Sequence, residues 1–359
     1  MKIKCCRICS NKKLIKIGTL GNLAISSFID KPKKGKKYPL ELVYCKTCTL
    51  LQLAHNIPRN LLYKDYWYAS RINPVIVKDL KEIARLCRGT TISIGENDGT
   101  MLKYAKKAYP QIAVDPSQFA PTGPQIWIRD YWENVRTLNA NTITAIACLY
   151  DIPNPNKFIK NVTRHLKEDG VFIAQLQTLS PMIELNDVGN ICHEHLLYFS
   201  YKSLVYLFEQ NGLEIYRVER NKINGGSYRI FARHYKKGSI AFKEKIYGVR
   251  ELKDFFKRIE VNKFKMVTFI KKHDVVGFGA STKMGTIVQY YGVSPKIVVD
   301  ANPDKVGKYT LSGALIVNKI PKDCKYLWVF PYGFIEYFKK KEKGYKGKWI
   351  TTIPKFKII

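Results

Sequence analysis

The stretch Thr90–Tyr104, TTISIGENDGTMLKY, constrains the fold of this chain more than any other part of the sequence. Its apolar run Thr91–Ile94 predicts a buried strand, and a polar turn leads from that strand into the first turn of a helix. Gly95 and Gly99 in the turn permit positive φ and a close approach of the backbone to a ligand. A strand, a tight glycine turn and a helix in this order predict a doubly wound α/β sheet.

A second apolar run, Gln111–Val114, ends at Asp115. A carboxylate at the tip of a second parallel strand is placed to accept hydrogen bonds from a ribose diol. The dinucleotide fingerprint requires three spaced glycines, and here Asn97 and Asp98 replace the middle one. This replacement weakens the prediction of NAD as the ligand and favours a nucleoside without a pyrophosphate. The first candidate is S-adenosylmethionine (SAM). An ordinary βα turn is the alternative.

The alternation of strands and helices continues along the chain. We expect strands at Thr142–Leu149, Val171–Leu176, Leu213–Val218 and Tyr228–Arg233, helices from Pro74, at Asn156–Leu166 and at Ser200–Asn211, a turn at Asp169–Gly170, and a charged, mainly helical stretch at Lys236–Lys272. The segment Val275–Gly285 repeats the strand, glycine turn and helix, and Asp300 follows the next strand, Ile297–Val299. This second nucleotide-type half could bind a phosphate near Lys283 or serve packing only.

Four of the nine cysteines form two Cys-x-x-Cys pairs separated by about 35 residues. Two such pairs supply four thiolates to one tetrahedral Zn²⁺, and a site with no open position is structural. The predicted ligands are Cys6, Cys9, Cys45 and Cys48. Four unrelated reduced cysteines are the alternative. The odd total and the scatter of the other cysteines argue against a disulfide framework and for a reducing, cytoplasmic compartment.

The densest polar cluster is Cys192-His193-Glu194-His195. The zinc motif of helices requires His at i and i+4, which this alternation lacks. In extended chain His193 and His195 point the same way, and Glu194 points the other way. An imidazole is the natural general base near neutral pH, and a carboxylate can orient it. An exposed polar loop is the alternative.

The net charge of +32 arises from 61 Lys and Arg against 29 Asp and Glu, spread along the whole chain. A basic surface could bind nucleic acid, but no RNA-binding signature accompanies the charge. We therefore favour a solvated lysine-rich face. No apolar run approaches the ~20 residues of a membrane span.

Taken together, these stretches resemble the SAM-dependent sugar C-methyltransferases, which act on nucleotide-linked keto-deoxysugars. The resemblance covers nearly the whole chain. It rests on seven motifs in the right order: the two cysteine pairs, Tyr66-x-Tyr68-x-Ser70, Ile94–Gly99, His193-Glu194-His195-x-x-Tyr198-Phe199-Ser200, Asn224-Gly225-Gly226-Ser227-x-Arg229, Gly277-x-Gly279-Ala280-x-x-Lys283 and Asp300-x-Asn302-Pro303-x-Lys305-x-Gly307.

The resemblance implies three domains: a zinc-binding lobe over residues 1–70, a Rossmann-like SAM-dependent methyltransferase domain over 71–236 and a C-terminal Rossmann-like domain over 237–359. It implies a nucleotide sugar as partner and a monomer or homodimer. His195 would be the general base. The residues that would hold SAM are Gly95, Asn97, Asp98, Gly99 and Asp115. The residues that would surround the sugar are Glu194, His193, Tyr66, Tyr68, Asn224, Arg229 and Lys283.

Three positions depart from the family pattern. Cys192 stands where many members have a tyrosine that contacts the sugar, Asp151 stands where a His or other polar residue is common, and Pro331–Phe334 lacks the family's Trp-Asn. The sugar, the nucleotide and the methylated carbon therefore stay open. Two other functions also stay open, an RNA or DNA methyltransferase with a zinc ribbon and a non-catalytic protein that binds a nucleotide sugar.

Overall fold

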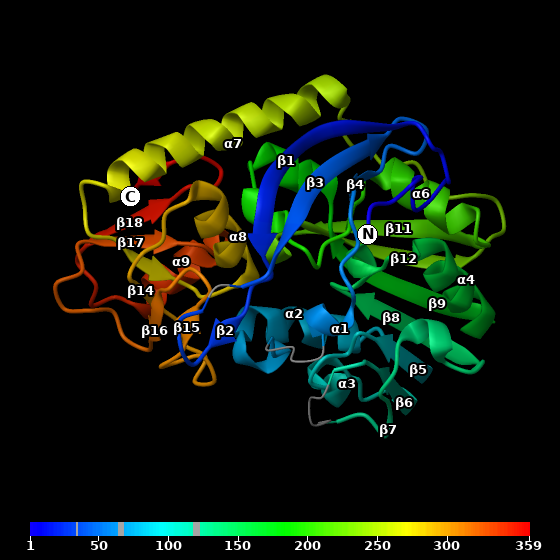
Figure 1. The fold of residues 1–359 in the computed structure, drawn as a ribbon. Helices are drawn as coiled ribbons and strands as arrows, with labels where there is room; N and C mark the ends of the chain where they lie inside the picture. Colours follow the sequence, from blue (N-terminus) through cyan, green and yellow to red (C-terminus); the bar gives the residue numbers. More distant parts are fainter. Residues whose placement is uncertain (34, 64–67, 118–122) are drawn as a thin grey trace.

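Three β-sheets organise the chain in the computed structural model, which describes residues 1–33, 35–63, 68–117 and 123–359. Figure 1 shows the central sheet on the right, the C-terminal sheet on the left, and the N-terminal hairpin of β1 (Leu14–Ala24) and β3 (Lys37–Cys45) arching above their junction. Parallel strands and flanking helices in two of the sheets confirm the predicted α/β class. Within the described ranges, we find no helix that could span a membrane.

The central sheet has the order β11-β12-β9-β8-β5-β6-β7. Its strands are β5 (Gly89–Ile94), β6 (Ala108–Val114), β7 (Ile126–Ile128), β8 (Ala140–Ile146), β9 (Leu166–Gln177), β11 (Leu213–Asn221) and β12 (Ser227–His234). The strands from β5 to β9 run parallel, whereas β12 is antiparallel to both of its neighbours, β9 and β11. The order reverses between β5 and β8, so the crevice at their carboxyl ends is where such sheets bind ligands.

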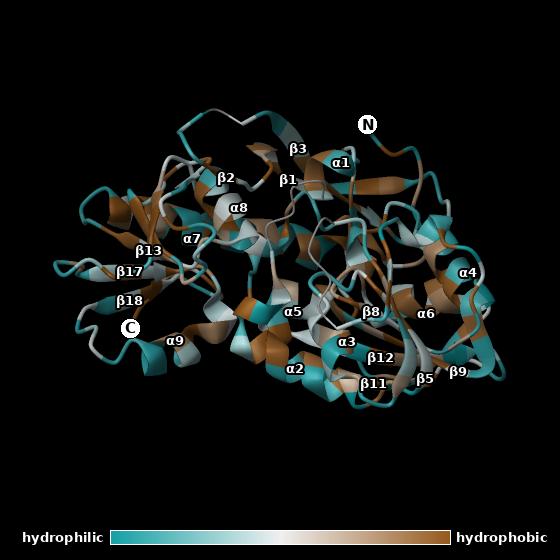
Figure 2. Ribbon diagram, turned by 90° about the horizontal axis from the view of Figure 1, so that it is seen from below, coloured by the Kyte–Doolittle hydropathy of each residue, from teal (hydrophilic) through white to brown (hydrophobic). Residues whose placement is uncertain are grey.

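Capping residues determine where helices of this part of the chain begin. Asn73 caps one of them, because its side chain accepts a hydrogen bond from the Val75 amide at 3.0 Å and Pro74 occupies the first helical position. The helices are α1 (Asn60–Tyr63), α2 (Pro74–Ala84), α3 (Thr100–Tyr104), α4 (Pro155–His165), α5 (Leu179–Glu184) and α6 (Tyr201–Glu209). Figure 2 shows hydrophobic residues along the strands and hydrophilic residues on the outer loops.

The C-terminal sheet repeats the parallel arrangement around β13, in the order β19-β18-β17-β13-β14-β16-β15-β2. Its strands are β13 (Val276–Phe278), β14 (Ile297–Val299), β15 (Tyr309–Thr310), β16 (Leu315–Val317), β17 (Tyr326–Val329), β18 (Lys348–Thr351) and β19 (Lys357–Ile358). Its helices are α7 (Val249–Ile270), α8 (Thr282–Tyr291) and α9 (Ile335–Lys341).

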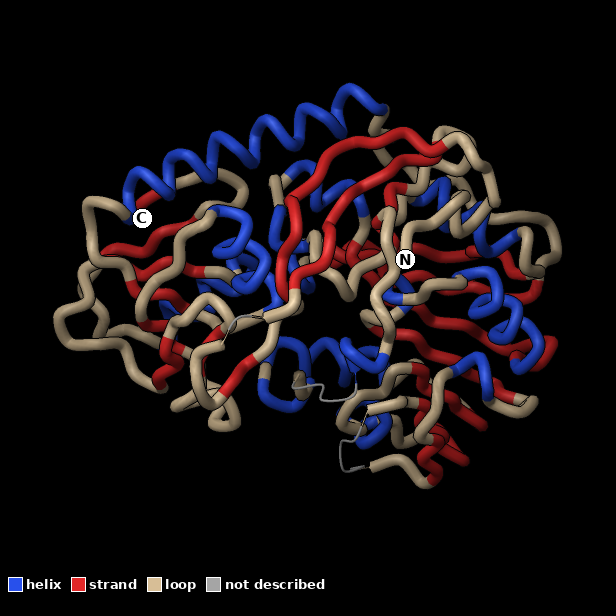
Figure 3. Tube along the Cα trace, viewed as in Figure 1, coloured by secondary structure: helices blue, strands red, loops and turns tan. Residues whose placement is uncertain are grey.

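The N-terminal sheet exchanges strands with the other two domains. β1 and β3 pair with β4 (Leu51–Leu53), and β4 in turn pairs with β10 (Leu197–Tyr198), which directly follows the His-Glu-His cluster in sequence. β2 (Phe28–Ile29) leaves this lobe and pairs with β15 in the C-terminal sheet. Figure 3 shows the two long strands of the lobe, β1 and β3, running between the two larger sheets. The lobe therefore contacts both sides of the molecule.

One of the expectations about secondary structure is wrong. The turn at Asp169–Gly170 does not form, because β9 runs through it and absorbs the extra residues as a register shift against β8. The prediction that Lys236–Lys272 is mainly helical is confirmed by α7, although the residues before Val249 have no regular structure. The remaining predicted strands and helices form within a few residues of the expected ends.

Candidate active site between two nucleotide-type sheets

A cavity of about 530 Å³ lies where the central sheet faces the C-terminal domain. The carboxyl ends of β5, β6 and β8 line it from one domain, and the turn after β13 and the first residues of α8 line it from the other. This volume is in the range of sites for small molecules. Ligands held by either sheet therefore share one space.

Asp115 stands in the cavity wall at the end of β6. Its two carboxylate oxygens accept hydrogen bonds from the amides of Asn97 and Ser117, each at 2.8 Å. A carboxylate has about four acceptor sites, so capacity remains for a ribose diol. Gly95, with a φ of 68°, lines the same wall, and a Cβ there would lie 3.0 Å from that of Cys148. These groups fit the ribose end of SAM.

Asn97 and Asp98 shape this wall from behind. The Asn97 side chain accepts from the Ser70 amide at 3.0 Å and donates to the Tyr68 carbonyl at 2.9 Å, while also lining the cavity. The Asp98 side chain is fully buried and accepts from the Arg71 amide at 3.0 Å. Asp98 and Gly99, expected at SAM itself, are absent from the wall because they build the turn before α3.

The C-terminal sheet repeats this arrangement with different residues. The Asp300 carboxylate at the end of β14 accepts from the amides of Ala280 and Asn302, each at 2.8 Å, and Gly279 has a φ of 90°. Asp300 and Gly279 line the same cavity. The cavity therefore holds two strand-end carboxylates, each fixed by a glycine-turn amide.

His195 lines the cavity near the interface of the two domains. Its Nδ1 lies 3.0 Å from both the backbone carbonyl and the side-chain oxygen of Asn190, and its ring meets Tyr150 edge-on with centroids 4.4 Å apart. Burial, and then the charge of Lys283, lower the pKa of His195 to about 3. The imidazole is therefore neutral at physiological pH.

The rest of the His-Glu-His cluster faces away from this wall. His193 is buried, its Nε2 lies 3.2 Å from the Tyr38 carbonyl of β3, and burial lowers its pKa to about 4. The two histidines do not point the same way as expected, because the backbone bends at His193 and Glu194. Cys192 and Glu194 are also buried outside the cavity wall, and burial raises the pKa of both.

Lys283 reaches the cavity from α8. Its ammonium forms an ion pair with the buried Asp187 and lies 3.4 Å from the carbonyl of Asn224, a residue with a φ of 55° that also lines the cavity. The Tyr332 hydroxyl donates to the same Asp187 carboxylate at 3.2 Å. A fixed positive charge therefore stands in the wall.

Three other expected residues have different placements. Arg229 is absent from the cavity wall, because its guanidinium donates to Asp79 at 2.7 Å and to Gln175 at 2.9 Å. It supports two side chains that do line the wall. Tyr68 lines the cavity, and burial raises its pKa to about 12. Tyr66 lies outside the described residues.

Sequence reasoning missed Tyr150 and Asn190, which hold His195, and Asp187, which holds Lys283. Tyr150 belongs to the short turn η3 (Leu149–Asp151) and Asn190 to η4 (Val188–Asn190). Both turns are irregular, so no periodicity in the sequence predicts which side chain faces the histidine. Only the offset of five residues between Asn190 and His195 offered a signal, and it is too common to be specific.

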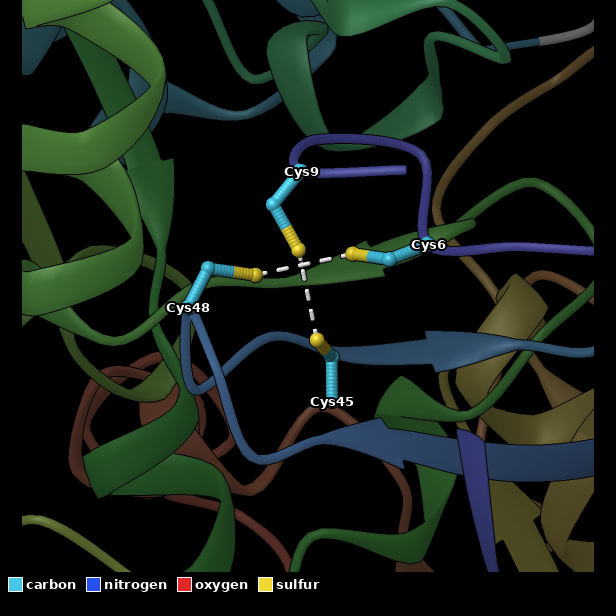
Figure 4. Close-up of side chains that lie close together, drawn as sticks. All are labelled: Cys6, Cys9, Cys45 and Cys48. Atoms are coloured by element: carbon cyan, nitrogen blue, oxygen red, sulfur yellow. Dashed lines mark hydrogen bonds between the residues drawn. The ribbon is translucent and has the colours of Figure 1, made fainter. Parts of the chain in front are cut away.

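The four predicted metal ligands meet in the N-terminal lobe. Figure 4 shows Cys6 and Cys9 on one loop facing Cys45 and Cys48 at the end of β3. All four Sγ atoms lie within 4.8 Å of one another, and Cys6–Cys48 and Cys9–Cys45 are 3.5 and 3.4 Å apart. Zn–S bonds of about 2.3 Å give a tetrahedron with edges of about 3.8 Å, so the cluster fits zinc. The hydrogen bond between the Cys6 and Cys48 thiols lowers the pKa of Cys6 to about 5 and raises the pKa of Cys48, while burial raises the pKa of Cys9 to about 11.

Comparison with known proteins agrees with this arrangement. Family models match residues 6–63 ("Putative zinc binding domain"), 68–218 ("Methyltransferase domain") and 222–354 ("C-methyltransferase C-terminal domain"). The C-methyltransferase NovU of Streptomyces niveus is 24% identical over 99% of this chain and 96% of its own length.

Solved structures resemble parts of the chain. A Burkholderia thailandensis 1,6-didemethyltoxoflavin N1-methyltransferase, solved with S-adenosylhomocysteine, is 12% identical over 45% of this chain and 78% of its own, with a TM-score of 0.36. The N-methyltransferase NodS of Bradyrhizobium japonicum is 12% identical over 45% of this chain and 94% of its own, with a TM-score of 0.34.

The matched domains and the cavity at the switch point of the central sheet define a SAM-dependent methyltransferase that also carries a structural zinc site. Within that class, the N-terminal, central and C-terminal parts of the chain each match a separate family model, and the model matched at the C-terminus is that of a C-methyltransferase domain.

Proposed function

We propose that this C-methyltransferase acts on a nucleotide-linked keto-deoxysugar and that His195 is its general base. One observation carries the proposal: the cavity that contains the SAM-type carboxylate Asp115 also contains a second strand-end carboxylate, Asp300, and a neutral imidazole. A nucleotide on the C-terminal sheet and SAM on the central sheet would leave the sugar near His195. NovU is named a C-methyltransferase, which supports carbon as the acceptor.

The chemistry follows from what carbon requires. A carbon next to a ketone becomes nucleophilic when its C–H bond breaks, the proton goes to the imidazole and the electron pair forms an enolate. Lys283, which lines the cavity while paired with Asp187, would donate a hydrogen bond to the enolate oxygen and stabilise its charge. SAM supplies the sulfonium methyl group, which the carbon takes as the S–CH₃ bond breaks. Asp115 and Asp300 hold SAM and the nucleotide sugar next to each other, which converts a bimolecular step into a nearly unimolecular one.

Mass spectrometry of nucleotide keto-sugars incubated with the protein and SAM tests the substrate class. We expect the mass of one added methyl group on at least one sugar of the panel, and exchange of its acidic proton with solvent deuterium even without SAM. If SAM binds but no sugar gains mass or deuterium, the chain is a non-catalytic relative.

The variant His195→Asn tests the base. We expect kcat to fall by ~10²–10⁴, the usual contribution of a general base, while SAM affinity measured by calorimetry stays unchanged. His273→Asn, an exposed histidine outside the cavity wall, is the matched control and should retain full activity. Unchanged turnover in His195→Asn would reject the role of the imidazole.

A further inference from the structure

The turn η4 packs two oxygens of one residue against His195. Asn190 ends the turn, is 4% exposed, and offers both its backbone carbonyl and its side-chain oxygen to Nδ1 at 3.0 Å. The Tyr198 hydroxyl donates to the same carbonyl at 3.4 Å. The Tyr150 ring closes another side of the imidazole. The ring plane is therefore held by contacts from three short elements.

This contact also fixes the tautomer. A backbone carbonyl can only accept, so Nδ1 must carry the hydrogen, and Nε2 of the neutral ring must carry the lone pair. The Asn190 amide then presents its oxygen, because its NH₂ group would face another donor. Among the described residues, none makes a hydrogen bond to Nε2, and the ring lines the cavity. Nε2 is therefore the atom available to a substrate.

We propose that Asn190 is a positioning residue that holds His195 as the Nδ1–H tautomer and directs Nε2 into the cavity. This proposal rests on the role of His195 as base given above. Asn190 touches no reacting atom itself and acts through the histidine.

The turn also connects the imidazole to the C-terminal domain. Asp187, just before the turn, pairs with Lys283 of α8. A Cβ on Gly189 would lie 2.9 Å from the Cβ of Lys283, so glycine allows the turn to sit directly on that helix. The same turn therefore places the base and the cation of the cavity relative to each other. It does so only while α8 is docked on it.

Three substitutions test the role. Asn190→Ala removes the side-chain acceptor, and we expect kcat to fall on the order of 10-fold to 100-fold with KM nearly unchanged, because orientation and not binding is lost. Asn190→Asp keeps an acceptor and should restore most of kcat. Its carboxylate should also raise the pKa of His195 by about 1 to 3 pH units and bring an acid limb into the pH profile. Asn139→Ala, at an exposed asparagine outside the cavity wall, serves as the control.

The other charged and titratable groups around the histidine are Lys283 of α8 with its partner Asp187, Tyr150 of η3, Tyr198 of β10, and Glu194, which precedes it in the chain. They are the same in all three variants. A difference in the pKa of His195 between the wild type and Asn190→Asp is therefore caused by the new carboxylate.

Nitrogen-15 NMR of histidine-labelled protein provides a readout that does not need a substrate. We expect His195, assigned by its loss in His195→Asn, to show a protonated Nδ1 in the wild type and also in Asn190→Ala, which keeps the backbone carbonyl, with the Nδ1 resonance of Asn190→Ala shifted by the loss of the side-chain acceptor. A protonated Nε2 in the wild type would overturn the proposal, as would Asn190→Ala with wild-type kcat and pH profile. If His195→Asn is fully active while the tautomer is as expected, the proposed base is wrong but the contact stands. If Asn190→Ala fails to fold, Asn190→Asp alone decides through its pH profile.

Discussion

Asp115 and Asp300 hold the same place in two different sheets. Each ends a parallel strand, and each accepts one amide from a glycine turn and one from the residue two positions further on. Only the domain around them differs. The pair therefore allows the two ligand positions of the cavity to be tested separately.

Asp115→Ala should weaken the binding of SAM, whereas Asp300→Ala should leave the binding of SAM unchanged. A hydrogen bond to a charged group contributes about 1.5–3 kcal/mol, so we expect the Kd for SAM to rise by about 10- to 150-fold in Asp115→Ala alone. Asp300→Ala should instead raise the KM for the nucleotide sugar. Calorimetry with SAM and steady-state kinetics measure the two effects. An equal loss of SAM affinity in both variants would contradict the division of the cavity.

The depressed pKa of His195 predicts the pH dependence. Burial disfavours the imidazolium and lowers the pKa from 6.5 to about 3, so the proton-accepting form persists as the pH falls through 6.5. We expect kcat/KM to stay level between pH 8 and 6. The wild-type profile could instead fall near pH 6.5, and the residual activity of His195→Asn could lack that fall. This result would show that the pKa of His195 is not depressed.

Residues of this site differ in how far sequence alone could place them. Asp115 could be predicted from the sequence because a strand, a glycine turn and an acidic residue follow one another within 25 residues, as in nucleotide-binding sheets. Asn190 and Tyr150 could not be predicted, because irregular turns bring them to His195. Arg229 was misplaced because its buried acidic partner, Asp79, lies 150 positions away in the chain.

At the scale of elements, the metal cluster supports a strand of the active site. β4 begins three residues after Cys48 and pairs with β10, which begins two residues after His195. The Thr49 and Ser200 hydroxyls lie 2.7 Å apart across the same contact. Loss of the metal would therefore loosen the segment that carries the imidazole.

Cys45→Ser should abolish zinc binding and with it most activity. We expect about one zinc per wild-type chain by elemental analysis, almost none in Cys45→Ser, and a lower melting temperature, since the four thiolates join the loop of Cys6 and Cys9 to the end of β3. SAM affinity should change less than kcat, because no residue of the lobe's four-strand sheet lines the cavity. Cys324→Ser, outside the cluster, is the control. A metal-free wild type that stays folded and active would contradict the role of the cluster.

Elements with a strong period were predictable, and those that depend on distant pairing were not. β5, β8 and α2 follow their local pattern. The two-residue strands β2 and β10 have no pattern of their own and exist only because another domain offers an edge. The expected turn at Asp169–Gly170 failed because the pairing of β9 with β8 outweighs the local turn preference.

For the molecule as a whole, the excess of positive charge has two explanations that an experiment separates. If it is a solvated face, RNA should bind weakly, with an affinity that falls steeply as salt rises, and should receive no methyl group from labelled SAM. Filter binding at physiological ionic strength and scintillation counting of the RNA measure both. Tight binding with methyl transfer would instead favour an RNA methyltransferase.

The crossing of β2 into the C-terminal sheet limits how these proteins can be recombined. A chimera built by exchanging residues 237–359 for those of a relative would leave the new sheet facing a foreign edge at Phe28–Ile29. The donor's counterpart of those few residues would have to travel with it. Attempts to reprogramme sugar choice by swapping the last third of the chain should therefore succeed only when two separate pieces of gene are moved together.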